Sequence, residues 1–194
     1  ADKSIIEEAS AYSMLGHGYR LMGSNIKGLE YHHKAIALAE KSNNYSLMAI
    51  AEHQMAHIYK DRGEYEKAIQ LYRSASSLAE KGKNESIRRW PFANLGTVYL
   101  LTNKLDSALM VSQKGYEIIT STKDNRLLFL VLLNLAGIHN KMGNTALAIT
   151  YLNMAKKEVE GGPYIKYLNL LYISLADYYQ SLHQTDSCEL YAKK

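Results

Sequence analysis

Cysteine and proline are almost absent from this sequence of 194 residues, which contains one cysteine and two prolines. A single cysteine, Cys188, excludes an intrachain disulfide and provides no metal-ligand spacing. Tryptophan and phenylalanine are also rare: the chain has one Trp and two Phe, compared with 16 Tyr. So few prolines in a chain of this length predict long helices joined by short turns.

Neither charge nor hydrophobicity is concentrated in one part of the chain. The net charge of +4 is small, and basic residues do not cluster beyond Arg88 and Arg89, so we expect no nucleic-acid binding. The longest apolar run, 127–133, is far shorter than the roughly 20 residues of a membrane span. A 47% hydrophobic and 22% charged composition is typical of a folded soluble protein. Since the chain has neither an initiator Met nor a signal peptide, we expect a mature or excised segment of unknown localisation.

One short phrase recurs at an unbroken interval of forty residues. Its five copies read MLGHGYRLMG (14–23), QMAHIYKDRG (54–63), NLGTVYLLTN (94–103), NLAGIHNKMG (134–143) and SLADYYQSLH (174–183). The third residue of every copy is small: Gly16, Ala56, Gly96, Ala136 and Ala176. A fixed period of this size predicts a stacked helical repeat array. Function is then expected along one face of the stack.

Each repeat predicts two helices, A and B, separated by a tight turn. The residue after helix A is Gly23, Gly63, Asn103, Gly143 or His183. Gly and Asn tolerate the left-handed conformation that ends a helix, so four copies predict a stop and His183 predicts a poorer one. The A helices are expected near 5–22, 45–62, 86–102, 125–142 and 164–182, and the B helices near 25–41, 65–82, 105–121, 145–160 and 185–194.

Two segments interrupt this pattern. Gly161-Gly162-Pro163 is the strongest helix breaker in the chain and predicts a gap before the last A helix. Pro91 falls early in the third A helix, where its missing N–H is expected to delay or kink the helix start. We expect one all-α array over residues 1–194, with repeats near 9–48, 49–88, 89–128, 129–168 and an incomplete 169–194.

The recurrent residues resemble the signature of the tetratricopeptide repeat (TPR) family. They are Tyr59, Gly63, Ala68, Tyr72 and Ala75 in the second repeat, and Leu95, Gly96, Tyr99 and Ala108 in the third. The chain departs from the family in its period of forty rather than about thirty-four residues and in lacking the signature tryptophan. The longer helices this implies are similar to the branch that includes kinesin light chains and peptide-sensing regulators of Gram-positive bacteria. The resemblance implies a right-handed superhelical solenoid whose A helices line a concave groove, and binding of peptides or proteins without catalysis.

Side-chain amides on three consecutive A helices are the main candidates for ligand contact: Gln54, Asn94 and Asn134. They lie on the sector of the A helices opposite the packed one. Each amide both donates and accepts hydrogen bonds, which suits a peptide backbone. In TPR peptide binders an asparagine on this face clamps the ligand backbone, and Asn94 and Asn134 are similar to that residue. The alternative is that the amides only solvate an exposed face or bridge neighbouring helices.

Three more residues complete the candidate peptide-binding groove. Trp90, one turn before Asn94, is expected either to anchor a ligand or to pack against neighbouring helices. Gly137 lies within a helix, where Gly costs about 1 kcal/mol relative to Ala, so its missing side chain either admits a ligand or eases packing. Thr97 lies on the same sector as Asn94.

Basic residues gather on the first two A helices: His17, Arg20, His53, His57 and Lys60. Together they could receive a carboxylate or another anion, although a solvated basic face is the commoner explanation. His53 and His57 also have the i, i+4 spacing of helical metal ligands, but no acidic residue or thiol completes a metal site. We therefore expect no metal and no cofactor.

The sequence favours a binding scaffold that holds an extended peptide or partner segment in the groove. The alternative is a sensory or oligomerisation region of a larger bacterial regulator, such as a transcriptional regulator or a kinase. The array stops inside its fifth B helix without a polar cap, so a homodimer through this repeat is a further expectation. No phosphate loop, nucleophile elbow or paired carboxylates are found, so no enzymatic activity is expected.

Overall fold

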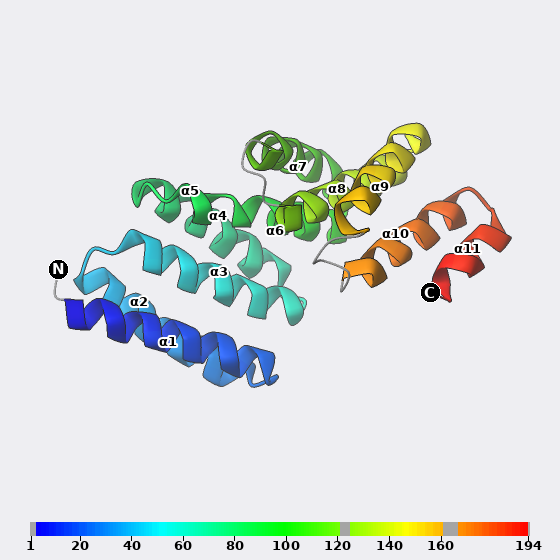
Figure 1. Cartoon of the computed structure of the whole chain (residues 1–194). Helices are drawn as coiled ribbons and strands as arrows, with labels where there is room; N and C mark the ends of the chain where they lie inside the picture. Colours follow the sequence, from blue (N-terminus) through cyan, green and yellow to red (C-terminus); the bar gives the residue numbers. More distant parts are fainter. Residues whose placement is uncertain (1–2, 121–124, 161–166, 194) are drawn as a thin grey trace. The chain divides into compact units, whose positions relative to one another are not determined.

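The computed structural model describes residues 3–120, 125–160 and 167–193, and all regular structure within these ranges is helical (Figure 1). The chain divides into two compact units, 1–98 and 99–194, which are described one at a time. The first holds α1 (Lys3–Leu21), α2 (Asn25–Lys41), α3 (Tyr45–Asp61), α4 (Tyr65–Lys81), α5 (Glu85–Arg88) and the start of α6 (Trp90–Leu101). The second holds the end of α6, α7 (Leu105–Thr120), α8 (Asn125–Lys141), α9 (Thr145–Val159), α10 (Leu168–Ser181) and α11 (Thr185–Ala192).

The predicted all-α repeat architecture is confirmed. Helix α1 packs against α2, and α3 packs against α2, α4 and α1, as consecutive elements of a stack do. The third A helix is divided at Arg89 into α5 and α6, which agrees with the interruption predicted from Pro91. The breaker Gly161-Gly162-Pro163 lies outside the described residues.

The turn after each A helix contains a residue with positive φ. Gly23, Gly63 and Gly143 have φ of 77°, 76° and 80°, and Asn103 has 57°. His183, which the sequence marked as a poor stop, also has a positive φ of 56°. The hydrogen bonds that close a helix end therefore impose the left-handed conformation here even without Gly or Asn.

Small residues form the contact between the two helices of a repeat. A Cβ on Gly28 in α2 would lie 3.2 Å from the backbone oxygen of Gly16 in α1. A Cβ on Gly16 would lie 2.8 Å from the ring of His32, which is fully buried. Ala56 and Ala68, at the corresponding places in the second repeat, are also fully buried. The row of small residues predicted from the sequence is thus where helices A and B meet.

The second unit has a larger aliphatic and aromatic core. Phe129, Leu132, Leu152, Leu171 and Leu175 form its centre, and each is at most 5% exposed. Small residues, Ala136, Ala148 and Ala155, lie within the same cluster. In this unit, large side chains of α8, α9 and α10 fill the space around the close helix contacts.

We expect Gly16→Ala to destabilise the protein by about 1–3 kcal/mol, because the added methyl meets the His32 ring, which is held in a packed core. Gly18→Ala, two residues later in the same helix, should instead stabilise it by roughly 0.5–1 kcal/mol, since nothing lies within 4 Å of its new Cβ. Urea unfolding of both variants measures the difference. Equal effects would contradict the close contact at Gly16.

Two equivalent turns between helices B and A allow a second comparison. Asn43 and Lys83 are both exposed and have φ of 50° and 51°. The left-handed conformation costs Lys more free energy than Asn. We therefore expect Lys83→Gly to raise the free energy of unfolding by about 1 kcal/mol. Asn43→Gly should change it by less than about half as much. Chemical denaturation of the two variants tests this order, and a larger gain at Asn43 would contradict it.

Candidate functional site

The amides of Gln54 and Asn94 are half-buried, and internal hydrogen bonds fix their orientation. Gln54 Oε1 in α3 accepts from His17 Nδ1 in α1 at 3.1 Å. Asn94 Nδ2 in α6 donates to the backbone oxygen of Trp90 at 3.0 Å and lies 3.5 Å from His53 Nε2. The hydrogens of Gln54 Nε2 and the oxygen of Asn94 are therefore the atoms that these bonds leave for another partner.

Trp90 packs on its own unit while remaining half-buried. Its side chain lies against a core cluster of Ala49, Leu78, Ala79 and Ile87. Its ring centroid is 5.6 Å from that of His53. Trp90 therefore takes part in packing at the place where the sequence allowed either packing or ligand contact.

A chain of hydrogen bonds links Tyr72 in α4 to the two histidines of α3. Tyr72 Oη lies 3.1 Å from His57 Nδ1, and His57 Nε2 lies 3.1 Å from His53 Nε2. Since Asn94 Nδ2 is a donor to His53 Nε2, that nitrogen is the acceptor. His57 Nε2–H then donates to His53, and the Tyr72 hydroxyl donates to His57. Both rings are neutral in this assignment, and the single lone pair of His53 Nε2 accepts the 3.1 Å bond from His57 and the longer 3.5 Å contact from Asn94.

The electrostatics of this network agree with neutral rings. Burial, followed by the nearby His53 and the cations around it, lowers the pKa of His57 from 6.5 to about 2. Burial is also the main cause that raises the pKa of Tyr72, so its hydroxyl remains a donor. His53, which is 3% exposed, and the half-buried His57 thus form a hydrogen-bonded pair.

Two of the other groove candidates, Asn134 and Gly137, occupy closed positions. Asn134 in α8 is only 5% exposed. A Cβ on Gly137 would lie 2.8 Å from Leu100 Cδ2, so a neighbouring side chain already occupies that space. This favours the packing alternative for Gly137. Thr97 is half-buried, and its hydroxyl donates to the backbone oxygen of Ala93 at 3.0 Å.

Two of the basic residues of α1 and α3 contact an acidic residue, Asp61, that the sequence analysis did not include in the candidate site. Arg20 Nη1 lies 3.2 Å from Asp61 Oδ2, and Lys60 Nζ lies 3.6 Å from Asp61 Oδ1. The Asp61 carboxylate thus already pairs with Arg20 and Lys60, two of the cations that the sequence predicted could receive an anion. His17, Arg20 and Lys60 are half-buried, whereas Asp61 is exposed.

Asp61 could have been found from the repeat period. Arg20 and Asp61 are 41 residues apart, and so are Asn140 and Ser181, whose side chains hydrogen-bond at 2.7 Å. Lys141 Nζ likewise donates to Leu100 O across 41 residues. Three times, therefore, a residue near the end of one A helix contacts the residue one place further along in the next A helix. A period of forty plus one residue is the signal that predicts these partners.

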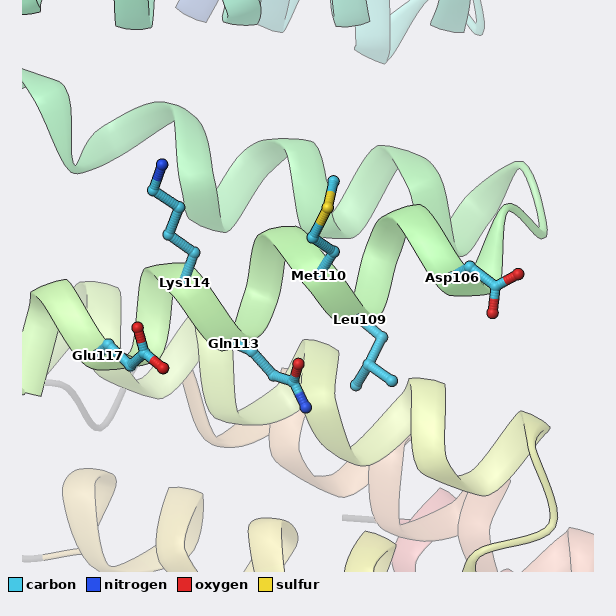
Figure 2. Close-up of a pocket in the computed structure, with 6 residues that line it drawn as sticks. All are labelled: Asp106, Leu109, Met110, Gln113, Lys114 and Glu117. Atoms are coloured by element: carbon cyan, nitrogen blue, oxygen red, sulfur yellow. The ribbon is translucent and has the colours of Figure 1, made fainter.

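A shallow depression on α7 has none of these features. It is lined by Asp106, Leu109, Met110, Gln113, Lys114 and Glu117, and Figure 2 shows that all six side chains come from this single helix. Residues of one helix surround a ligand poorly, so we assign it no site. Within the described ranges no group of three or more His, Cys, Asp or Glu could hold a metal ion, and no helix is long and apolar enough to cross a membrane.

Comparison with known proteins agrees with the repeat architecture. A family model for the tetratricopeptide repeat matches residues 7–81 and again residues 47–121. No curated protein matches the sequence. Among solved structures, apo RapI is similar with a TM-score of 0.78 and 15% identity, over 99% of this chain and 63% of RapI.

Two other solved structures have the same fold. A kinesin light chain-like repeat protein of Podosopora anserina is similar with a TM-score of 0.70 and 16% identity, over 95% of this chain and 91% of that one. A Rap protein complexed with competence and sporulation factor has a TM-score of 0.73 and 14% identity, over all of this chain and 64% of that one. The chain therefore spans less than two thirds of the two Rap structures.

His32, beneath Gly16, is a buried titratable residue outside the hydrogen-bonded pair. It is fully buried, and neither ring nitrogen has a hydrogen-bond partner among the described residues. Burial is the main cause that lowers its pKa from 6.5 to about 4. The corresponding residue of the fourth repeat is Leu152, which is 2% exposed, so an aliphatic side chain fits this place in the fold.

We expect the free energy of unfolding to fall as the pH decreases from about 6.5 towards 4. In this range the unfolded chain binds a proton at His32 that the folded chain does not, which favours unfolding. His32→Leu should reduce this slope, leaving the part that His57 contributes, and should raise stability near pH 5 by about 1–3 kcal/mol, because it removes unpartnered buried nitrogens. Urea titrations between pH 4.5 and 7.5 measure both effects. His33→Gln, at the exposed neighbouring histidine, is the control, and an equal flattening in this control would refute the assignment to His32.

Proposed function

The chain belongs to the tetratricopeptide repeat family, and from that premise we propose that it is a scaffold that binds an extended peptide or a partner segment along its A helices. The groups that make this contact are the amides of Gln54 and Asn94, with Trp90 beside them. Asn134, which is nearly closed off, contributes less. No catalytic step is proposed.

The fixed orientation of the two amides is the observation that carries this proposal. His17 holds the oxygen of Gln54, so this side chain offers N–H donors to a ligand carbonyl. The backbone of Trp90 holds the nitrogen of Asn94, so this side chain offers an oxygen to a ligand N–H. A peptide backbone exposes both kinds of group, and side chains held in place lose little entropy on binding.

Solved structures of similar fold support the proposal at the level of the fold. A Rap protein of the same fold is complexed with competence and sporulation factor, although its identity to this chain is only 14%. If the chain is instead a sensory region of a larger bacterial regulator, it would bind its ligand in the same groove. The basic group of α1 and α3 is a weaker candidate for ligand contact, because Asp61 already pairs with Arg20 and Lys60. Binding of an acidic ligand there would need to displace this carboxylate.

Panning a displayed library of random linear peptides on the protein, followed by fluorescence anisotropy with the enriched peptide, tests the proposal. We expect Gln54→Ala and Asn94→Ala each to weaken binding about fivefold, the loss of one neutral hydrogen bond. Asn134→Ala should have a smaller effect because that side chain is buried.

Gln113→Ala is the matched control, since it removes an exposed amide from α7 outside the proposed contact (Figure 2). Enrichment of no peptide, or equal losses for Gln113→Ala and Asn94→Ala, would count against the groove.

A further inference from the structure

Three polar side chains occur together only in the second repeat: His53 and His57 in α3, and Tyr72 in α4. The place of His53 is held in the other repeats by Ser13, Ala93, Leu133 and Ile173, and the place of Tyr72 is held in the first, third and fourth repeats by His32, Ser112 and Leu152. Ala93 and Leu152 are buried at these places, at 1% and 2% exposed. The repeat fold therefore does not require polar side chains there.

The hydrogen bonds of these three side chains lead to an amide of the proposed groove. Burying polar groups costs free energy unless hydrogen bonds replace those made to water. Tyr72, which is fully buried, bonds to His57, and His57 bonds to His53, each at 3.1 Å. The next group along is Asn94, whose Nδ2 lies 3.5 Å from His53 Nε2. The chain thus runs from the interior of the repeat to a side chain that we expect to contact a ligand.

The backbone oxygen of Trp90 fixes the direction of these hydrogen bonds at the groove end. A carbonyl oxygen only accepts, so the atom of Asn94 that lies 3.0 Å from it is the amide nitrogen. The same nitrogen faces His53 Nε2, which accepts, and His57 therefore donates to His53. The opposite direction would turn the oxygen of Asn94 towards the oxygen of Trp90, where two acceptors would meet.

The hydroxyl of Tyr72 favours the same direction at the buried end. His57 Nδ1 is the one acceptor within hydrogen-bond distance of this hydroxyl among the described residues. If the bonds ran the other way, His57 would donate to Tyr72, and the buried O–H would have no acceptor, which costs free energy. Both ends of the chain therefore favour one arrangement, with the nitrogen of Asn94 turned inward.

We infer that His53, His57 and Tyr72 are positioning residues of the proposed groove, because their hydrogen bonds hold the nitrogen of Asn94 inward and leave its oxygen for a ligand N–H. The inference rests on the proposed function, since it concerns the same amide. Linked hydrogen bonds in a protein interior strengthen one another, so a change at one end of the chain is felt at the other. Tyr72, which is fully buried and out of reach of a ligand, therefore contributes to ligand affinity through Asn94.

NMR spectra of the histidine ring nitrogens in the unliganded protein test the direction of the chain, because an imidazole N–H and a bare nitrogen have well separated chemical shifts. We expect the bare nitrogens to be Nε2 of His53 and Nδ1 of His57. Tyr72→Phe keeps the ring and removes the hydroxyl, so a second form of His57, with its proton on Nδ1, should appear. A bare Nε2 in His57 of the wild type, or no second form in Tyr72→Phe, overturns the inference.

Fluorescence anisotropy with the peptide enriched by panning tests the effect on binding. His53→Phe keeps a planar ring beside Trp90 but removes the acceptor, so we expect binding about threefold weaker, and Tyr72→Phe should weaken it about twofold. In an Asn94→Ala background neither change should weaken binding further, whereas in a Gln54→Ala background both should keep their full effect. A merely structural role would give the same loss in both backgrounds.

His139→Phe is the matched control. His139 is also a buried histidine of an A helix, and its described contacts are with Tyr151 and Asn144, so this change should leave the affinity unchanged. Circular dichroism checks that each variant folds, and if His53→Phe does not, Tyr72→Phe carries the same comparison. Equal losses in the two backgrounds, or no loss in either, overturn the inference alone. Enrichment of no peptide would instead overturn the proposed function and the inference with it.

Discussion

The close approach of two helix backbones at a small residue is the constraint on which the rest of the structure depends. In the first repeat a Cβ on Gly28 would stand 3.2 Å from the oxygen of Gly16, so both positions must be small if the helices are to meet. Packing at this distance fixes the angle and the register of helices A and B. Once each pair has the same register, consecutive pairs stack with the same offset, and equivalent side chains of successive A helices lie beside one another.

The polar contacts between repeats follow from that offset. Arg20 meets Asp61, and Asn140 meets Ser181, each across 41 residues, because the stack brings one residue of an A helix beside the next place in the following helix. The same step places Asn94 beside His53. Side chains that could have solvated a free surface are instead bonded to the neighbouring repeat. The two alternatives considered for the amides, bridging helices and binding a ligand, are therefore compatible, since an amide bridges with one atom and keeps the other for a partner.

Much of the fold could be predicted from the sequence, because the signal was repeated five times. The period fixed the number of helices, and Gly or Asn at the turns located most helix ends. His183 shows the limit of reading residue type alone, since it adopts a φ of 56° that its neighbours' hydrogen bonds impose. Burial was harder to predict. A helical wheel placed Asn134 on an open sector, yet it is 5% exposed, because an A helix in an array is covered from both sides by neighbours that the wheel omits.

The same omission explains why the first repeat differs from the others although its sequence has the same pattern. Leu15 and Met55 hold equivalent places, but their exposures are 47% and 3%. The difference lies in the helix that covers Met55 and has no counterpart over Leu15 among the described residues. Since the hydrophobic free energy depends on the area removed from water, about 25 cal/mol per Å², an apolar residue at this place stabilises the array only where a neighbouring helix covers it. Repetition thus makes the fold predictable from the sequence, whereas the burial of one side chain depends on which helix lies beside it.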